Sequence, residues 1–287
     1  MRVRKKGYWL YLVPSLVLFL AVIVVPFLMN LGVSFTRWSG VGTPRWVGLE
    51  NYARLLEDER FWLSFQNNVA LIFAMAIVPT VLGLVLAAAL FDYIGRRFGP
   101  RTASALRAMY YLPQVLPVAV AGVVWGWMLH PSYGAVNQAF GLELDWLGDP
   151  DLALATVMAV MVWFQLGYPV VIFMAGLQRV DPAYYEAAEL DGASWWRKVW
   201  HITIPQIRPE IFVVLLTCTI AALKVFGPIF VLTRGGPGNA TLVPSYFSYL
   251  NFFQKSNVGY GSAIATVLAL IIVVVTFLFL RVQERES

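Results

Sequence analysis

The sequence has few charged residues. Only 13% of its 287 residues are Asp, Glu, Lys or Arg, whereas 59% are hydrophobic. A typical soluble domain has about a quarter of its residues charged and about half of them apolar. This shortage of charge excludes an ordinary soluble domain and indicates an integral membrane protein.

Cysteine and histidine are nearly absent, which excludes several kinds of site. The single cysteine, Cys218, lies in an apolar run and cannot form an intrachain disulfide or a cysteine-based metal site. We interpret it as a small buried hydrophobic residue. The two histidines, His130 and His201, fall on opposite sides of the membrane in the topology below, so they cannot share a site. We therefore expect no metal site.

Motifs for nucleotide binding and hydrolysis are also missing. The sequence contains no Gly-Lys dipeptide, so it has no phosphate-binding loop of the G-x-x-x-x-G-K-[ST] kind. It also lacks the G-x-S-x-G and H-E-x-x-H signatures of hydrolases. We expect no catalytic residue and no cofactor in this chain, which makes an intramembrane enzyme the least favoured function.

What the sequence does have is long apolar runs. A transmembrane helix needs about 20 mainly apolar residues to cross roughly 30 Å of hydrocarbon. Six runs qualify, and they predict an all-α polytopic membrane protein with a single transmembrane domain over residues 1–287. The run after the basic start MRVRKK is too long for a signal peptide, so we expect an uncleaved first span. The predicted spans are residues 9–35, 65–90, 108–129, 152–177, 211–232 and 260–280.

Positive charges predict the orientation of these spans. The two tails, the second loop and the fourth loop together hold 14 Lys and Arg; the other loops hold 6, four of them in the first loop. Cytoplasmic loops of membrane proteins carry an excess of Lys and Arg. Both termini and the fourth loop are therefore placed in the cytoplasm. We assign the net charge of +5 to this bias rather than to nucleic-acid binding.

Polar side chains inside the predicted spans are candidates for a transport path, because placing them against lipid is costly. Lys224 is the only charged residue in the six runs. Its side chain either extends to the outer interface or lines a substrate path. The candidate path residues are Asn68, Gln114, Gln165, Lys224 and Phe226.

The fourth loop contains a charged segment that is interrupted by a glycine. Asp181-Pro182 is a typical helix start, because Asp caps free backbone N–H groups and Pro suits the first turn. Gly192 allows the positive φ that ends many helices. A second short helix follows with three tryptophans, and we expect Arg197 and Lys198 to point to lipid headgroups or cytosol. The segment is predicted to be an amphipathic helix–turn–helix over residues 181–205.

One face of the first of these helices suits contact with a protein. Tyr184, Ala187, Ala188 and Asp191 share that face, and the two alanines leave it low enough for another surface to approach the backbone. A connector lying on lipid is the alternative. Acids and alanines make a poor lipid-binding face, so the composition favours docking into a protein groove.

These residues also resemble a known family. The pattern EAA…G…I-x-L-P is reproduced, with Ile204 in place of the usual leucine, by Glu186, Ala187, Ala188, Gly192, Ile202 and Pro205. It resembles the cytoplasmic signature of permease subunits of binding-protein-dependent ABC importers. Further stretches are similar to the carbohydrate-uptake branch, in particular the maltose, lactose or glycerol-phosphate type of first permease subunit: VGLENYARLLEDERFW, YLPQVLPVAVAGVVWGWMLHPSYGAVN and LKVFGPIFVLTRGGPGNAT.

The resemblance implies an assembly in the plasma or inner membrane of a bacterial or archaeal cell. A second permease subunit, commonly different from the first, forms the path together with this one. Two separate ATPase subunits bind ATP and Mg. An extracytoplasmic solute-binding protein delivers a sugar, which is a di- or oligosaccharide or a related polyol or sugar phosphate.

The resemblance also implies roles for residues of the fourth loop. Glu186 is the polar anchor on the ATPase, Ala187 and Ala188 form the close-contact surface, and Gly192 forms the turn. The chain departs from the family at Gly227, where relatives often have an acid, and this argues against a charged pair near Lys224. The residues expected to contact the ATPase are Glu186, Ala187, Ala188, Asp191, Gly192, Ile202 and Pro205.

A stand-alone secondary transporter or channel is the alternative function. An inverted repeat between the two halves of the chain is typical of many secondary transporters. The sequence shows no clear repeat of this kind, and the alternative does not explain a docking segment in the fourth loop.

Overall fold

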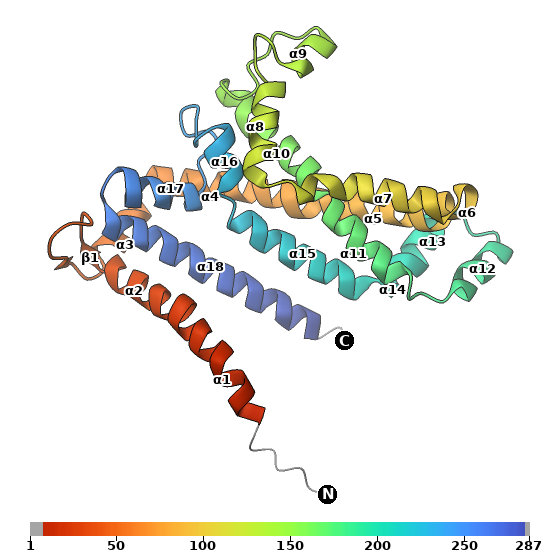
Figure 1. The fold of residues 1–287 in the computed structure, drawn as a ribbon, viewed down its shortest axis with the longest axis horizontal. Helices are drawn as coiled ribbons and strands as arrows, with labels where there is room; N and C mark the ends of the chain where they lie inside the picture. The colour runs from red at the N-terminus through yellow and green to blue at the C-terminus, as the bar shows by residue number, and fades with distance from the viewer. Residues whose placement is uncertain (1–7, 285–287) are drawn as a thin grey trace, which may run out of the picture. The chain divides into compact units, whose positions relative to one another are not determined.

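The structure, a computed structural model, describes residues 8–284 and is mostly helical (Figure 1). Within these residues, the strands form an antiparallel ribbon of two short segments, β1 (Thr36–Arg37) and β2 (Arg45–Trp46). The connecting residues 39–44, SGVGTP, include two glycines and a proline that cannot continue a helix, so the chain turns back. The all-α prediction is correct for the helices and wrong for this ribbon.

The described residues form two compact units. The first contains the chain up to Phe61 together with Phe247–Leu270; the second contains Trp62–Tyr246 and the chain from Ile271. The helices that begin in the first unit are α1 (Tyr8–Phe19), η1 (Leu20–Val24), α2 (Val25–Ser34), α3 (Glu50–Glu57), α4 (Glu59–Ile72), η5 (Leu250–Gln254) and α18 (Val258–Glu284).

Side-chain hydrogen bonds hold the first unit together. The Asn30 amide of α2 donates to the Ser262 carbonyl at 3.3 Å and to Thr266 Oγ1 at 3.0 Å, and both acceptors belong to α18. The Tyr260 hydroxyl, also on α18, donates to Asp58 Oδ2 at 2.6 Å. These bonds satisfy polar groups that have little access to water.

The remaining elements begin in the second unit. Those before the fourth loop are η2 (Phe73–Ile77), α5 (Val78–Ala88), η3 (Ala89–Ile94), α6 (Gly95–Phe98), α7 (Pro100–Val115), α8 (Val118–Met128), α9 (Ala135–Phe140), α10 (Pro150–Gln165) and α11 (Gly167–Leu177). Those that follow are α12 (Pro182–Leu190), α13 (Trp195–Lys198), η4 (Val199–Thr203), α14 (Ile204–Gln206), α15 (Arg208–Leu223), α16 (Gly227–Leu232) and α17 (Pro244–Tyr249).

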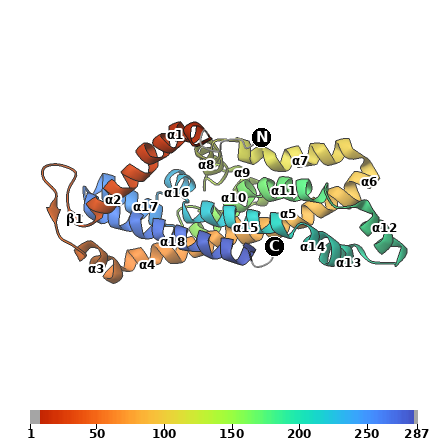
Figure 2. The same ribbon diagram turned by 90° about the horizontal axis from the view of Figure 1, so that it is seen from below.

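The core of the second unit lies where α11 packs against α5, α7 and α15 (Figures 1 and 2). Gly83 on α5 lets α11 approach closely, because a Cβ there would lie 2.6 Å from Pro169 Cβ. At one end of this unit, α12, α13 and α14 lie near α6 in both views. The buried core residues are Ala76, Ala87, Leu90, Val170, Phe173, Met174, Leu177, Val180, Tyr185, Ile207, Val214 and Cys218.

Four helical stretches of the described chain are long and apolar enough to cross a membrane: Tyr11–Ser34, Glu59–Ile94, Pro150–Leu177 and Val258–Gln283. Two bent pairs bring the number to six if each pair counts as one span. They are Arg101–Val115 with Val118–Met128, bent by 96°, and Trp195–Gln206 with Arg208–Leu223, bent by 76°. Each of the six predicted spans overlaps one of these stretches or pairs.

Two predicted spans are not continuous helices, and proline chemistry explains both breaks. In the predicted span 108–129, Leu116 is extended (φ −71°, ψ 137°), as expected for a residue before a proline, here Pro117. In the predicted span 211–232, α15 ends at Leu223, because Pro228 has no N–H to donate to the Lys224 carbonyl. Lys224 therefore lies at a helix end and not inside a helix.

Candidate functional site

The first helix of the fourth loop, α12, is closed at both ends as its sequence predicts. At its start, Asp181 Oδ1 accepts a hydrogen bond from the Ala183 N–H at 2.9 Å. At its end, Gly192 has a φ of +71°, and its N–H donates to the Glu189 carbonyl at 3.0 Å. The Ala193 N–H donates to the Ala188 carbonyl at 2.9 Å. These two bonds form a Schellman motif, which fixes the turn after α12.

The outward face of α12 is open. Glu186, Ala187 and Asp191 are exposed, and Ala188 is half-buried. Leu190 is also exposed, at 90%. The face that the sequence assigns to a protein partner is therefore accessible, and its small side chains allow a partner to approach the backbone.

The opposite face of α12 is held by Tyr185, a residue that the sequence analysis did not single out. Tyr185 is only 2% exposed and belongs to the core of the second unit. Its hydroxyl forms a 3.0 Å hydrogen bond with the Thr203 hydroxyl of η4, and its ring lies 6.0 Å from the Phe91 ring. One buried aromatic residue thus connects α12 both to the second helix of the loop and to the membrane-spanning core.

Three charged side chains meet beside this anchor. Lys198 Nζ on α13 lies 2.8 Å from Asp92 Oδ2 on η3 and 2.9 Å from Glu189 Oε1 on α12. The prediction that Lys198 points to headgroups or cytosol is wrong, because its side chain is 9% exposed. Burial alone lowers the Lys198 pKa, but the hydrogen bonds and charges of Asp92 and Glu189 outweigh it and raise that pKa above its ordinary value.

The second helix of the loop runs from Trp195 to Gln206 and ends at the 76° bend before α15. Trp196 and Trp200 are exposed on it, as expected for residues at a membrane–water boundary. Of the two predicted coupling residues in this helix, Pro205 is exposed, whereas Ile202 packs against the core of the second unit. Ile202 therefore helps to hold the loop in place rather than presenting a free surface.

The start of the fourth loop is tied to the start of α15. Arg179, two residues beyond α11, forms an ion pair with Glu210. The Glu210 side chain also lies against Gly176, where a Cβ would come within 3.0 Å of Glu210 Cγ. The loop is thus fixed near both of its ends, and neither Arg179 nor Glu210 was a predicted site residue.

Three of the five predicted path residues are polar groups inside the second unit. The Gln114 amide donates to Gln165 Oε1 at 3.2 Å, and the Gln165 amide lies 3.2 Å from Cys218 Sγ. The buried Asn68 amide donates to the Ala222 carbonyl at 2.9 Å. The structure therefore brings the two glutamines together, and Asn68 is bonded to the backbone of α15.

Lys224 and Phe226 lie at the break between α15 and α16. The Lys224 side chain is exposed, and within residues 8–284 no hydrogen bond or ion pair joins it to Asn68, Gln114 or Gln165. The Phe226 ring stacks on Phe230 at 5.5 Å and lies 5.9 Å from the Tyr246 ring. The predicted path residues therefore form a glutamine pair and an aromatic cluster, not one continuous constellation.

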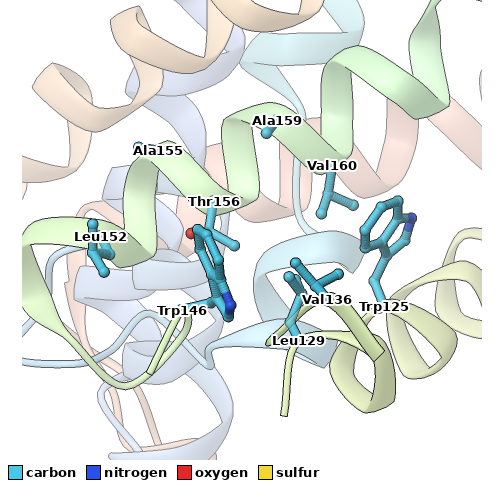
Figure 3. A pocket seen from close by; sticks show the side chains of 9 residues that line it. All are labelled: Trp125, Leu129, Val136, Trp146, Leu152, Ala155, Thr156, Ala159 and Val160. Carbon is cyan, nitrogen blue, oxygen red and sulfur yellow. The ribbon is translucent and has the colours of Figure 1, made fainter. Parts of the chain in front are cut away.

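An apolar cavity of about 370 Å³ lies between α8, α9 and α10. Figure 3 shows α10 side chains on one side of it and Trp146, Leu129 and Trp125 on the other. The Trp146 N–H donates to Asn137 Oδ1 at 2.7 Å, so this ring is fixed in the wall. Thr156 is the one hydroxyl in the lining, which gives the cavity little capacity to bind polar groups.

The fold and this site define an integral membrane protein with a polar helix–turn–helix anchored at one end of its helical core. Residues 80–286 match the family described as "Binding-protein-dependent transport system inner membrane component". The chain belongs to this family, so it is a permease subunit of a binding-protein-dependent transport system. The predicted resemblance is confirmed, and the stand-alone transporter or channel is not favoured.

Relatives and solved structures agree with this assignment. The chain is 36% identical to "Probable ABC transporter permease protein PH1215" of Pyrococcus horikoshii, over 81% of this chain and 80% of that one. It is 34% identical to "Trehalose/maltose transport system permease protein MalF" of Thermococcus litoralis, over 82% of this chain and 79% of that one. The relatives are transport permeases and not enzymes. The fold matches a chain of a bacterial ABC transporter involved in the import of alginate, with a TM-score of 0.83 at 22% identity. The match covers 96% of this chain and 94% of that chain.

Proposed function

We propose that this chain is one of two permease subunits of an ATP-driven sugar importer in the plasma or inner membrane of a bacterial or archaeal cell. The second subunit is a related permease and completes the path. An extracytoplasmic binding protein delivers the sugar, which is a di- or oligosaccharide or a related polyol or sugar phosphate. The Thermococcus litoralis relative is named for trehalose and maltose, which supports this substrate class.

The observation that carries the proposal is the two-sided construction of α12. Its outer face presents Glu186, Ala187 and Asp191 to a partner, whereas Tyr185 fixes its inner face to the core. A helix that only lay on lipid would direct a continuous apolar face toward the bilayer, whereas Glu186 and Asp191 interrupt the exposed face of α12. This arrangement suits a surface that receives motion from one protein and passes it to the membrane-spanning helices.

The partner at this surface is one of two ATPase subunits, which bind ATP and Mg. In this assignment Glu186 is the polar anchor, Ala187 and Ala188 allow close approach, and Asp191 and Gly192 shape the turn. In the second helix, Ile202 packs against the core, and the exposed Pro205 completes the surface offered to the ATPase. This chain contains no phosphate-binding loop of its own, so the energy of ATP hydrolysis has to reach it through such a contact.

The sugar path is assigned to the glutamine pair and the aromatic cluster. The amides of Gln114 and Gln165 offer both donors and acceptors to sugar hydroxyls. Phe226, beside Phe230 and Tyr246, offers an apolar ring face to the carbon–hydrogen face of a sugar. Asn68 supports the wall through its bond to Ala222, and Lys224 supplies a cation at the exposed end of α15.

Reconstitution in liposomes tests the proposal. The chain, its partner permease and the ATPase subunits are inserted together, and uptake of maltose or trehalose is followed with the binding protein outside and ATP inside. We expect uptake only when ATP and the binding protein are both present. Uptake by this chain alone without ATP would contradict the proposed function.

Reversal of one charge on α12 tests the role of its outer face. We expect Glu186→Lys to lower the sugar imported per ATP hydrolysed by about tenfold or more, because a like-charged or unpaired group at an interface is costly. Glu143→Lys, which reverses an exposed charge in the third loop, is the matched control. Equal import per ATP in both variants would exclude α12 as the contact.

A further inference from the structure

A charge cluster connects the two helices of the fourth loop to a segment about a hundred residues earlier in the sequence. Lys198 belongs to the second helix of the fourth loop, Glu189 to α12, and Asp92 to the end of the candidate span Glu59–Ile94. Lys198 Nζ lies within 2.9 Å of a carboxylate oxygen of each acid. The Lys198 and Asp92 side chains are 9% and 11% exposed, whereas Glu189 is 43% exposed. The Lys198–Asp92 pair is therefore poorly screened by water and salt.

We infer that Lys198 is a positioning residue that couples movement of α12 to the second span through Asp92. This inference rests on the proposed function, and it extends that function to residues outside the face that the partner contacts. When an ATPase displaces α12, Glu189 and Lys198 move with it, and the buried ion pair carries the displacement to Asp92.

The energetics of a buried ion pair give this connection its stiffness. Breaking the buried Lys198–Asp92 pair is strongly unfavourable, because both charges are largely removed from water. The Tyr185–Thr203 bond already holds α12 to the helix that carries Lys198. Small displacements of the loop therefore move the end of the second span with it rather than opening a gap between them.

The test compares single and double variants in the liposome system described above. Lys198→Met removes the cation at similar length, Asp92→Asn removes the buried anion, and the double variant removes both. Glu189→Gln is milder because its side chain is half-exposed, so it tests the connection with little risk to folding. Arg101→Met, which removes an exposed charge from α7, is the control. The measured quantity is the sugar imported per ATP hydrolysed, in assemblies shown by co-purification to contain all subunits.

We expect Lys198→Met and Asp92→Asn each to lower import per ATP by about tenfold, because each breaks the buried Lys198–Asp92 ion pair. The double variant falls no further than the worse single variant, because both changes break the same interaction. Glu189→Gln lowers the ratio by about threefold, since an exposed pair contributes less. Lys198→Arg retains import, because a surface pocket of about 430 Å³ beside Lys198 and Trp195 has room for the larger cation.

Three results would overturn the inference. Wild-type import per ATP in Lys198→Met shows that the pair transmits nothing. Losses that multiply in the double variant show that the two residues act separately. Unchanged import in Glu189→Gln, in a fully assembled complex, shows that α12 is not driven through Lys198. In contrast, wild-type uptake that needs no ATP overturns the proposed function itself, so the two failures are distinguishable.

Discussion

Replacement of Gly192 by alanine removes the conformational freedom on which the end of α12 depends. Gly192 has a φ of +71°, and nothing lies within 4 Å of an added Cβ, so the cost comes from the backbone and not from a clash. An L-residue in this left-handed region costs about 1–2 kcal/mol. The hydrogen bonds from Gly192 and Ala193 to the carbonyls of Glu189 and Ala188 require this conformation. We therefore expect the last turn of α12 to open more often.

Hydrogen exchange of the backbone amides measures this opening. A loss of 1–2 kcal/mol increases the open fraction about 5- to 30-fold, and amide exchange at residues 192 and 193 accelerates by the same factor if opening limits it. Gly126→Ala on α8 is the control, because Gly126 is helical and an added Cβ there also meets nothing within 4 Å. We expect that variant to be neutral or slightly stabilising. Unchanged exchange in Gly192→Ala would refute the argument from backbone conformation.

Two further experiments test the packing behind the site. Tyr185→Phe should lower the free energy of unfolding by about 1 kcal/mol, because it removes one partner of a buried hydrogen bond with Thr203. Adding Thr203→Val should recover most of that loss. Thermal unfolding in detergent, followed by tryptophan fluorescence, measures the stability of the single and the double variant. An equal or larger loss in the double variant would contradict the hydrogen bond between the two hydroxyls. Gly83→Val should destabilise the protein by about 1–3 kcal/mol, because its Cβ would lie 2.6 Å from Pro169 Cβ. A melting temperature equal to that of wild type would show that α5 and α11 can separate without cost.

The helix–turn–helix of the fourth loop was predictable because its signals are local. Asp181-Pro182 and Gly192 act within a few residues of the backbone groups that they cap or turn, so the sequence pattern alone places the ends of α12. The apolar runs likewise overlap the four to six candidate membrane-spanning stretches of the structure, because length and composition are sufficient to locate them. The placement of both termini in the cytoplasm stays a prediction from the charge count.

The inner side of the site was not predictable, because it depends on contacts between distant segments. Asp92 and Lys198 are 106 residues apart, and the predicted second span ended at residue 90, before Asp92. A basic residue in a loop is usually solvated, so the sequence predicted that the Lys198 side chain faces lipid headgroups or the cytosol. Tyr185 lies next to the more polar Glu186 in sequence, and its burial becomes visible only when α12 is docked on the core.

The end of α15 at Lys224 was not predicted from the sequence. Lys224 is the only charged residue in the mainly apolar run 211–232, so hydropathy alone predicts one helix there. Pro228 removes a backbone hydrogen bond there, and hydropathy does not register this effect. Together with the break at Pro117, it divides two of the six spans into shorter helices.

The burial of Cys218 makes this protein a ready background for thiol labelling. Cys218 is the only cysteine in the sequence and is fully buried in the core of the second unit. A cysteine introduced at an exposed position such as Ala187 would therefore react with a maleimide without interference from the native residue. The rate of that reaction, measured during turnover, would report when the outer face of α12 is covered and when it is free.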